Sequence, residues 1–127
     1  MNSTTFETKY CRISVYEDSG LIRKVVLSST NDLLETTSPI LVEAKKQIIE
    51  YFIGSRKCFD LPIELEGTEF KKAVLKEISK IEYGKVLSYK DLAKKSGYLK
   101  AVRVIGSVCS RNLLPLVIPC HRVIKSD

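Results

Sequence analysis

The sequence predicts an α+β fold: a small N-terminal antiparallel sheet with one helix, followed by a mainly helical unit that contains a helix-turn-helix. Two patterns predict it, because apolar residues alternate with polar ones near the N-terminus and recur at helical spacing in most of the remaining chain. Leu61-Pro62 separates the two patterns, so we expect a supporting domain over residues 1–62 and a second domain over residues 63–127. With 127 residues, the chain is long enough for one ordinary domain or two very small ones.

The N-terminal domain is predicted to contain a β-hairpin and a helix. Residues 10–17 alternate apolar and polar side chains, and the turn sequence Asp18-Ser19-Gly20 separates them from the apolar-rich residues 21–27. A helix is predicted from Pro39 to about Ile53, and its apolar stripe is formed by Leu41, Ala44, Ile48 and Phe52. This domain has no group of polar residues that suggests chemistry, so we expect it to give structural support.

Three helices are predicted in the second domain. The first follows the capping residue Thr68 and ends before Tyr83-Gly84. The other two run over about residues 89–95 and 100–110, and Gly97 breaks the chain between them. Two short helices joined by a glycine-containing turn are typical of a helix-turn-helix, so we expect a winged-helix-like domain.

The positive charge of the protein is concentrated in the second domain. The chain carries 21 basic and 15 acidic residues, for a net charge of +6. Residues 1–62 hold eight of each, whereas the nine basic residues between Lys85 and Lys125 accompany a single acid, Asp91. Such a local excess of positive charge favours binding to a polyanion such as nucleic acid. The alternatives are binding to an anionic membrane surface and a basic face that is simply solvated.

Several other classes of protein are excluded or disfavoured. No apolar run approaches the roughly 20 residues that span a membrane, which excludes an integral membrane protein. The N-terminus lacks the basic-then-apolar pattern of a signal peptide, so we expect a cytoplasmic protein, or a nuclear one in a eukaryote. The four cysteines are widely spaced and there is one histidine, a pattern that predicts neither a metal site nor a disulfide framework.

The predicted helix 100–110 has one apolar and one basic face. The inward-facing side chains are Val102, Ile105 and Val108. The outward-facing side chains are Lys100, Arg103, Ser107 and Arg111. The helix begins with Lys, Ala and Val, which do not read base edges well, so we expect phosphate contact and close approach to DNA. Gly106 costs about 1 kcal/mol relative to alanine inside a helix, so we expect a neighbouring group packed against its backbone.

Cys120 is the candidate nucleophile. It follows Pro119, which ends an apolar run over residues 113–118 that we expect to be a strand, and it precedes His121, the single histidine. A free thiol is mostly protonated at neutral pH, and a neighbouring imidazole that accepts its proton raises the reactive fraction. The more common role of a cysteine, that of a small buried hydrophobe, is expected for the other three thiols: Cys11, Cys58 and Cys109.

Pro119-Cys120-His121-Arg122-Val123 resembles the active-site signature of the O6-alkylguanine-DNA alkyltransferases, also called methylated-DNA–protein-cysteine methyltransferases. Residues 67–70, Gly-Thr-Glu-Phe, resemble a helix start of that family, and residues 83–89 resemble its Tyr-Gly-x-x-x-Ser-Tyr segment. Residues 103–106 resemble its Arg-Ala-Val-Gly, and Asn112 fits the approach to the reactive cysteine. The matches run in order through the whole of the second domain.

The resemblance implies DNA repair by direct, single-turnover transfer of an alkyl group from O6-alkylguanine in double-stranded DNA to Cys120. The guanine would be rotated out of the duplex, because its oxygen is inaccessible inside the stack. His121 is implied as the proton acceptor, through a water, and Asn112 as a residue that holds the active-site turn. No cofactor and no metal ion are implied, and the expected partner is the damaged DNA, bound by a monomer.

The resemblance also implies a set of DNA contacts. Tyr89 would push on the phosphate beside the flipped nucleotide, and Arg103 would enter the stack in place of the lost base. Ala101 and Val102 would lie against the minor groove. Lys90 and Ser126 match positions that can contact the DNA. The backbone of Val123 would help to recognise the edge of the guanine.

Three features depart from the family pattern. Leu113 replaces a usual proline, and Val104-Ile105 replaces Ala-Val. The chain ends at Asp127, before the Gly-rich loop and the glutamate-bearing helix of the family. We therefore expect a truncated sequence, or a natural short form with an incomplete pocket, in which activity is weakened and the fold is largely kept.

Two alternatives belong to other functional classes. A non-reactive sensor or binding module for alkylated DNA would explain the basic face, but the presence of Cys120 argues against the known non-reactive relatives, in which another residue takes its place. A cysteine hydrolase that uses Cys120 and His121 would explain neither the basic face nor the helix-turn-helix.

Overall fold

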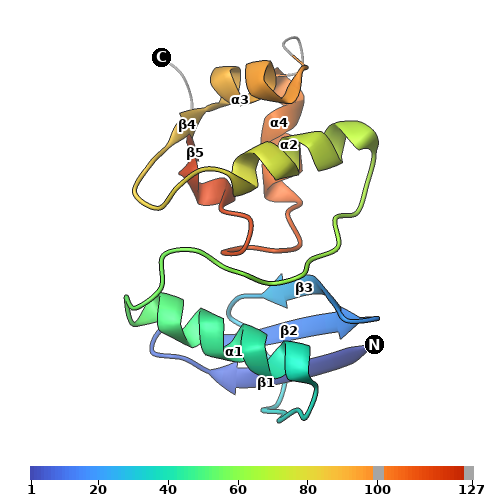
Figure 1. Ribbon diagram of the computed structural model, residues 1–127, viewed down its shortest axis with the longest axis vertical. Helices are drawn as coiled ribbons and strands as arrows, with labels where there is room; N and C mark the ends of the chain where they lie inside the picture. The colour runs from blue at the N-terminus through green and yellow to red at the C-terminus, as the bar shows by residue number, and fades with distance from the viewer. Residues whose placement is uncertain (99–101, 125–127) are drawn as a thin grey trace. The chain divides into compact units, whose positions relative to one another are not determined.

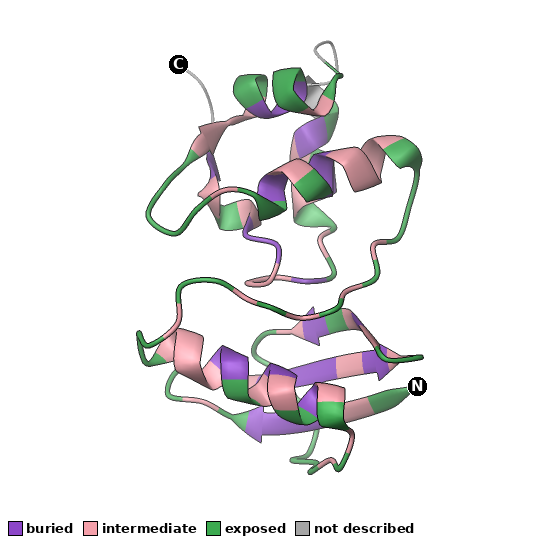
Figure 2. Ribbon diagram, in the orientation of Figure 1, coloured by how far each residue is buried: buried purple, intermediate pink, exposed green. Residues whose placement is uncertain are grey.

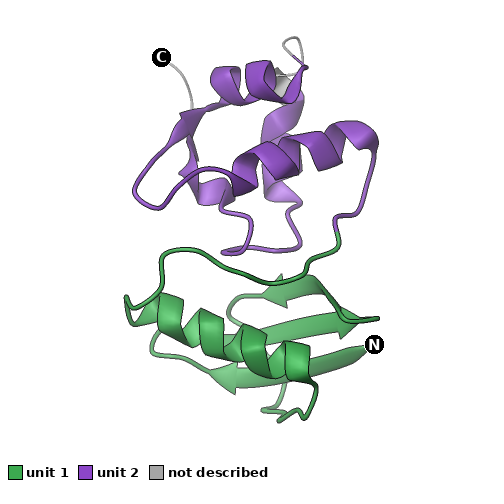
Figure 3. Ribbon diagram, viewed as in Figure 1, with its two compact units in different colours: residues 1–64 green, residues 65–127 purple. Residues whose placement is uncertain are grey.

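The computed structural model describes residues 1–98 and 102–124, with the backbone alone described at 102 and 103. The chain divides into two compact units, Met1–Glu64 (unit 1) and Leu65–Asp127 (unit 2) (Figure 3). Unit 1 combines an antiparallel sheet with a helix and unit 2 is mainly helical, which confirms the predicted α+β class. The assignment of support to one domain and of DNA binding and chemistry to the other stays a prediction.

Unit 1 is built on a three-stranded antiparallel sheet in the order β1-β2-β3 (Figure 1). The strands are β1 (Asn2–Glu7), β2 (Arg12–Asp18) and β3 (Leu21–Val26). Ser19 and Gly20 both have positive φ, 53° and 82°, as a tight hairpin turn requires. The predicted hairpin is therefore confirmed as β2 and β3.

Strand β1 lacks the apolar alternation that identifies a strand, and the sequence pattern does not predict it. Thr4 and Thr5 are nevertheless buried, and the strand is largely buried in Figure 2. The Thr4 hydroxyl donates to the carbonyl of Leu34 at 2.7 Å, and the Thr5 hydroxyl is hydrogen-bonded to that of Ser14 on β2, also at 2.7 Å. These two threonines can be buried because the hydroxyl of each has a partner.

Helix α1 (Pro39–Phe52) contacts all three strands of the sheet. Its predicted apolar stripe is fully buried at Leu41, Ala44 and Ile48. Gln47 is also buried: its side-chain oxygen accepts from the N–H of Asp60 at 2.9 Å, and its side-chain nitrogen donates to the Asp60 carbonyl at 3.0 Å. This amide ties the segment after α1 back to the helix.

Unit 2 contains the three predicted helices and a short 3-10 turn (Figure 1). The helices are α2 (Glu69–Ser79), α3 (Tyr89–Ser96) and α4 (Val102–Ser110), and the turn is η1 (Cys120–Arg122). Helix α2 packs against both α3 and α4, around a core that includes Val74, Leu75, Ile78, Leu92, Ile105, Val108, Leu114 and Ile118.

The predicted helix boundaries have identifiable causes in the structure. The Thr68 hydroxyl accepts from the N–H of Lys71 at 3.1 Å, and the Ser88 hydroxyl accepts from the N–H of Asp91 at 3.0 Å. These bonds satisfy backbone donors at the first turns of α2 and α3. Gly97 ends α3 with a φ of 85°, a conformation that glycine adopts without strain.

Two short strands of unit 2 are not predicted by the sequence pattern. Strands β4 (Leu87–Ser88) and β5 (Val123–Ile124) pair in parallel, with Leu87 opposite Val123. Two residues are too few to show an alternation, so these strands form because tertiary packing brings the segments together. The pairing places the segment after η1 beside the start of α3.

Two expectations from the sequence are wrong. Residues 113–118 form successive turns rather than a strand. Leu116 has a φ of 73°, and the N–H of Ile118 donates to the carbonyl of Leu114 at 2.8 Å, so the apolar run folds back on itself. Outside the backbone of its own helix, no atom of the described residues lies within 4 Å of the position that a Cβ of Gly106 would occupy, so the expected packing group is not found there.

Candidate active site and nucleic-acid interface

Cys120 is the first residue of η1 and lies half-buried in a turn that Asn112 holds together. The side-chain nitrogen of Asn112 donates to the carbonyl of Ile118 at 2.8 Å and to Sγ of Cys120 at 3.3 Å. The side-chain oxygen of Asn112 accepts from the N–H of Leu114 at 2.9 Å. One amide therefore bonds the turn at three points and directs a proton at the candidate nucleophile.

A second thiol adjoins Cys120, and sequence reasoning missed it. Cys109 lies on the last turn of α4, and its thiol is hydrogen-bonded to that of Cys120. Cys58 is exposed, and Cys11 and Cys109 are half-buried, so the expectation that these three cysteines are buried hydrophobes is wrong. The one sequence signal for the pair is the position of Cys109 at the inner edge of its helix.

The contact between the two thiols makes them unequal acids. The hydrogen bond from Cys120 lowers the pKa of Cys109, and burial opposes this shift. The same hydrogen bond raises the pKa of Cys120, as do burial and the charge of Cys109, whereas the bond from Asn112 lowers it. Burial and the contact with Cys109 therefore favour the protonated form of the Cys120 thiol.

His121 is exposed, and within residues 1–98 and 102–124 no hydrogen bond joins its imidazole to Cys120. Desolvation of the ring and the charge of Arg122 lower the pKa of His121. The imidazole is therefore neutral at pH 7 and able to accept a proton. Its role as an acceptor through a water stays a prediction.

Arg122 links the turn that carries Cys120 to the loop before β4. Its guanidinium donates to the carbonyl of Ile81 at 2.6 Å and lies 5.6 Å from the centre of the Tyr83 ring. This charged hydrogen bond holds two segments that are distant in the sequence at one end of unit 2.

The residues predicted to contact DNA lie on α3, α4 and β5. Tyr89 begins α3 and is half-buried, and Lys90 beside it is exposed. Val123 is buried on β5, and the pairing of β5 with β4 brings it into one region with Tyr89, which directly follows β4. Helix α4 begins with Val102 and Arg103. Two further predicted contacts lie outside the described residues: Ala101 and Ser126.

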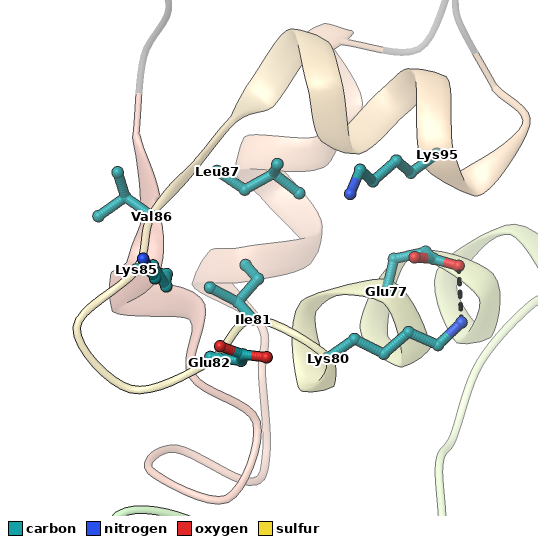
Figure 4. A pocket seen from close by; sticks show the side chains of 8 residues that line it. All are labelled: Glu77, Lys80, Ile81, Glu82, Lys85, Val86, Leu87 and Lys95. Carbon is teal, nitrogen blue, oxygen red and sulfur yellow. Dashed lines mark hydrogen bonds and ion pairs between the residues drawn. The ribbon is translucent and has the colours of Figure 1, made fainter.

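A surface hollow of about 250 Å³ lies beside the loop between α2 and β4 (Figure 4). Its lining residues are Glu77, Lys80, Ile81, Glu82, Lys85, Val86, Leu87 and Lys95. The lining carries both signs of charge, and Lys80 and Glu77 form an ion pair at 3.1 Å. Because Cys120 is not among the lining residues, this hollow is not where the thiol would meet a substrate.

In the described part of the chain, no group of three or more His, Cys, Asp or Glu side chains is placed to hold a metal ion. The described helices also include none with the length and apolar character needed to cross a membrane.

The chain is similar in sequence to proteins of one family. Residues 69–127 match the family model of the DNA-binding domain of 6-O-methylguanine DNA methyltransferase. The constitutive methylated-DNA–protein-cysteine methyltransferase of Bacillus subtilis is 41% identical over 133 residues, which cover 98% of this chain and 81% of the relative. The methylated-DNA–protein-cysteine methyltransferase of Methanosarcina barkeri is 44% identical over 85 residues, which cover 67% of this chain and 54% of the relative.

Solved structures show the same similarity. The crystal structure of Mycobacterium tuberculosis OGT in complex with DNA matches with a TM-score of 0.84 at 26% identity, covering 98% of this chain and 79% of that one. An O6-methylguanine DNA methyltransferase from Methanococcus jannaschii matches with a TM-score of 0.69 at 25% identity, covering 97% and 80%. From these similarities and the signature around Cys120, the chain belongs to the methylated-DNA–protein-cysteine methyltransferase family.

Proposed function

We propose that this protein repairs DNA by transferring an alkyl group from a damaged base to one of its own cysteines, and that Cys120 is the acceptor. The observation that carries the proposal is the half-buried Cys120 thiol, which the Asn112 amide holds at 3.3 Å in a hydrogen-bonded turn. Membership of a family of protein-cysteine methyltransferases supplies the reaction type.

The proposed substrate is O6-alkylguanine in double-stranded DNA. The matching family model is named for 6-O-methylguanine, and the relative from M. tuberculosis was solved in complex with DNA. Exposed basic side chains of unit 2 supply charge that neutralises phosphates: Lys85, Lys90, Lys94, Lys95 and Arg111. In the proposed form, one copy of the chain acts on each lesion, in the cytoplasm or, in a eukaryote, in the nucleus.

The proposed reaction is a displacement at a saturated carbon. The Cys120 thiolate attacks the alkyl carbon, an S–C bond forms, and the bond from that carbon to O6 breaks. The electron pair of the broken bond passes to the guanine, which takes up a proton. The proton of Cys120 leaves first, and the neutral imidazole of His121 is the proposed acceptor, through a water. The thioether is stable, so each molecule of the protein acts once.

Reaction within a duplex requires that the base leave the stack, which costs a few kcal/mol. Tyr89 and Lys90, at the start of α3, are proposed to act on the DNA backbone beside the flipped nucleotide. Arg103, in the first turn of α4, is proposed to fill the vacated space. The other proposed contacts are Ala101, Val102 and Ser126 with the DNA and the backbone of Val123 with the guanine edge.

Repair is measured with a duplex that carries one O6-methylguanine in a restriction site, because demethylation restores cleavage. We expect the wild-type protein to restore at most one site per molecule and then to stop. Cys120→Ser is expected to restore none, whereas Cys58→Ser, which changes an exposed thiol of unit 1, restores as many as the wild type. Tight binding without restored cleavage would contradict alkyl transfer and favour a non-reactive binding module.

A further inference from the structure

Alkyl transfer consumes one thiol, yet two thiols meet at this site. Cys109 comes from the last turn of α4 and Cys120 from the start of η1, and their side chains are hydrogen-bonded to each other. Both side chains are half-buried, so a small solute can reach them more easily than a macromolecule can. The other two cysteines, Cys11 and Cys58, belong to unit 1.

Asn112 bonds to both members of this pair. Its backbone N–H donates to the carbonyl of Cys109 at 3.3 Å, and its side-chain nitrogen donates to Sγ of Cys120 at 3.3 Å. Because one residue binds both cysteines, the turn cannot move far from the end of α4 without breaking these bonds. The Cys120 thiol is therefore held beside the end of α4, the segment that carries Cys109.

We propose that Cys109 and Cys120 form a reversible disulfide when a peroxide oxidises the pair, and that Cys109 thereby protects Cys120 from irreversible oxidation. Formation of the bond depends only on the two thiols and the oxidant. Its consequence, a reversible block of alkyl transfer, rests on the proposed function.

The oxidation proceeds in two balanced steps. The thiolate of Cys109 attacks one oxygen of hydrogen peroxide, an S–O bond forms as the O–O bond breaks, and the departing hydroxide takes up a proton to become water. The Cys120 thiol then attacks the sulfur of this sulfenic acid, an S–S bond forms, and a second water leaves with the proton of Cys120. The two thiols lose two electrons and two protons in total, and the peroxide is reduced to water.

Cys109 is the thiol that reacts first with the peroxide. The hydrogen bond that it accepts from Cys120 lowers its pKa, which raises its thiolate fraction, and the thiolate is the nucleophile. Once the sulfenic acid has formed, the nearest thiol is that of Cys120. A dithiol such as dithiothreitol then reverses the bond by thiol–disulfide exchange.

Bond formation requires a small movement of the site. A disulfide brings its sulfurs to about 2.05 Å, closer than two hydrogen-bonded thiols, so the turn moves toward α4. The hydrogen bond from Asn112 to Cys120 is weakened by this movement, and the oxidised sulfur is no longer a nucleophile. Without Cys109, the sulfenic acid of Cys120 has no neighbouring thiol and advances to the irreversible sulfinic and sulfonic acids.

The bond is tested by peptide mapping of the full chain. Trypsin cleaves after Arg111, which separates Cys109 in peptide 104–111 from Cys120 in peptide 112–122. Reduced protein is treated with an equimolar amount of hydrogen peroxide, and the remaining thiols are alkylated. We expect these two peptides to be joined, and dithiothreitol to release them. The peptides that contain Cys11 and Cys58 are expected to remain unjoined.

The protective role is tested with Cys109→Ser. Peroxide is expected to abolish alkyl transfer by the wild type, and dithiothreitol to restore it to the untreated level. The same treatment of Cys109→Ser leaves Cys120 as a sulfinic or sulfonic acid, and transfer stays lost. Cys58→Ser is the matched control and is expected to recover like the wild type. Circular dichroism checks the fold of Cys109→Ser, and Cys109→Ala provides a second variant.

Three outcomes would overturn the proposal: unjoined peptides with over-oxidised Cys120 in the wild type, links between molecules in place of the internal link, or full recovery of Cys109→Ser. The link is read by mass and needs no alkyl transfer. A joined pair in a protein that repairs no DNA therefore supports the disulfide and refutes the proposed function alone.

Discussion

Unit 1 and unit 2 use polar side chains in opposite ways. The buried polar residues of unit 1, none more than 5% exposed, are hydrogen-bonded within it: Thr4, Thr5, Ser14, Glu17 and Gln47. In the described part of unit 2 the buried side chains are apolar, and Asn112, Cys120 and His121 are half-buried or exposed. Unit 1 buries polar side chains and bonds them internally, whereas unit 2 leaves the polar side chains of its candidate site partly exposed.

Charge follows the same division. Unit 1 carries 8 basic and 9 acidic residues, and unit 2 carries 13 and 6. Ion pairs such as Arg12 with Glu7, at 2.7 Å, and Arg56 with Glu50, at 3.0 Å, neutralise basic side chains within unit 1. Unit 2 has too few acids to neutralise its own basic residues, so its field is available to a polyanion.

The largest effects are expected when two side-chain amides are removed, Asn112 in unit 2 and Gln47 in unit 1. Asn112→Ala removes three hydrogen bonds from the turn around Cys120, and we expect it to destabilise the protein by about 2 kcal/mol. It should also slow single-turnover alkyl transfer by about tenfold or more, since about 1.4 kcal/mol of lost transition-state stabilisation is a factor of ten.

Gln47→Ala is the matched change in unit 1, because it removes the two hydrogen bonds to Asp60. We expect a comparable loss of stability in urea unfolding, but an unchanged transfer rate at temperatures where the variant is folded. Equal transfer rates for Asn112→Ala and the wild type would contradict a functional role for the turn.

Arg103→Ala distinguishes DNA handling from chemistry within unit 2. We expect about tenfold slower repair of duplex DNA, because an unstacked base costs a few kcal/mol and the variant lacks the side chain that fills its space. Reaction with free O6-benzylguanine needs no unstacking and should be nearly unchanged. Arg56→Ala, in unit 1, is the control for both substrates. Equal losses of activity by Arg103→Ala on both substrates would exclude the proposal that Arg103 fills the space left by the flipped base.

Lys90→Gln and Lys46→Gln compare one exposed lysine from each unit. Each phosphate contact contributes about 0.9 to the slope of log affinity against log salt, so Lys90→Gln should reduce that slope by about this amount. Lys46→Gln, on α1, should leave both affinity and slope unchanged. Fluorescence anisotropy with a labelled duplex at several salt concentrations measures both. The same change in both variants would place DNA on both units.

Two glycines give the smallest expected effects, with opposite signs. Gly106→Ala should stabilise the protein by about 1 kcal/mol, because alanine is a better helix former and, outside the helix's own backbone, no atom of the described residues lies within 4 Å of the new Cβ. Gly20→Ala should destabilise it by about 1 kcal/mol, because its φ of 82° is strained for alanine. Thermal unfolding measures both. Destabilisation by Gly106→Ala would show that a group packs there after all.

The regular elements follow from the sequence where a pattern is long enough to be seen. The hairpin β2–β3 and the four helices have alternation, helical stripes and capping residues such as Thr68 and Ser88. Strand β1 could not be predicted, because its buried Thr4 and Thr5 are stabilised by hydrogen bonds to distant segments. The apolar run 113–118 was expected to be a strand, but turns bury Leu114 and Ile118 equally well.

The candidate site is harder to predict from the sequence, because it depends on how residues 113–118 fold back in turns. Cys120, His121 and Asn112 follow from the family signature, and the bonds of Asn112 to the turn add a physical reason for its position. The contact between Cys109 and Cys120 could not be predicted, because it exists only when residues 113–118 fold back. Neighbouring thiols are a property of the folded turn, and no spacing rule identifies them.

The most direct measurement is the mass of the tryptic peptides after reaction with duplex DNA that carries O6-methylguanine. Peptide 112–122, which contains Cys120, should gain the mass of one methyl group, and peptide 104–111, which contains Cys109, should be unchanged. A methyl group on peptide 104–111, or on no peptide while the duplex is bound, would show that Cys120 is not the acceptor.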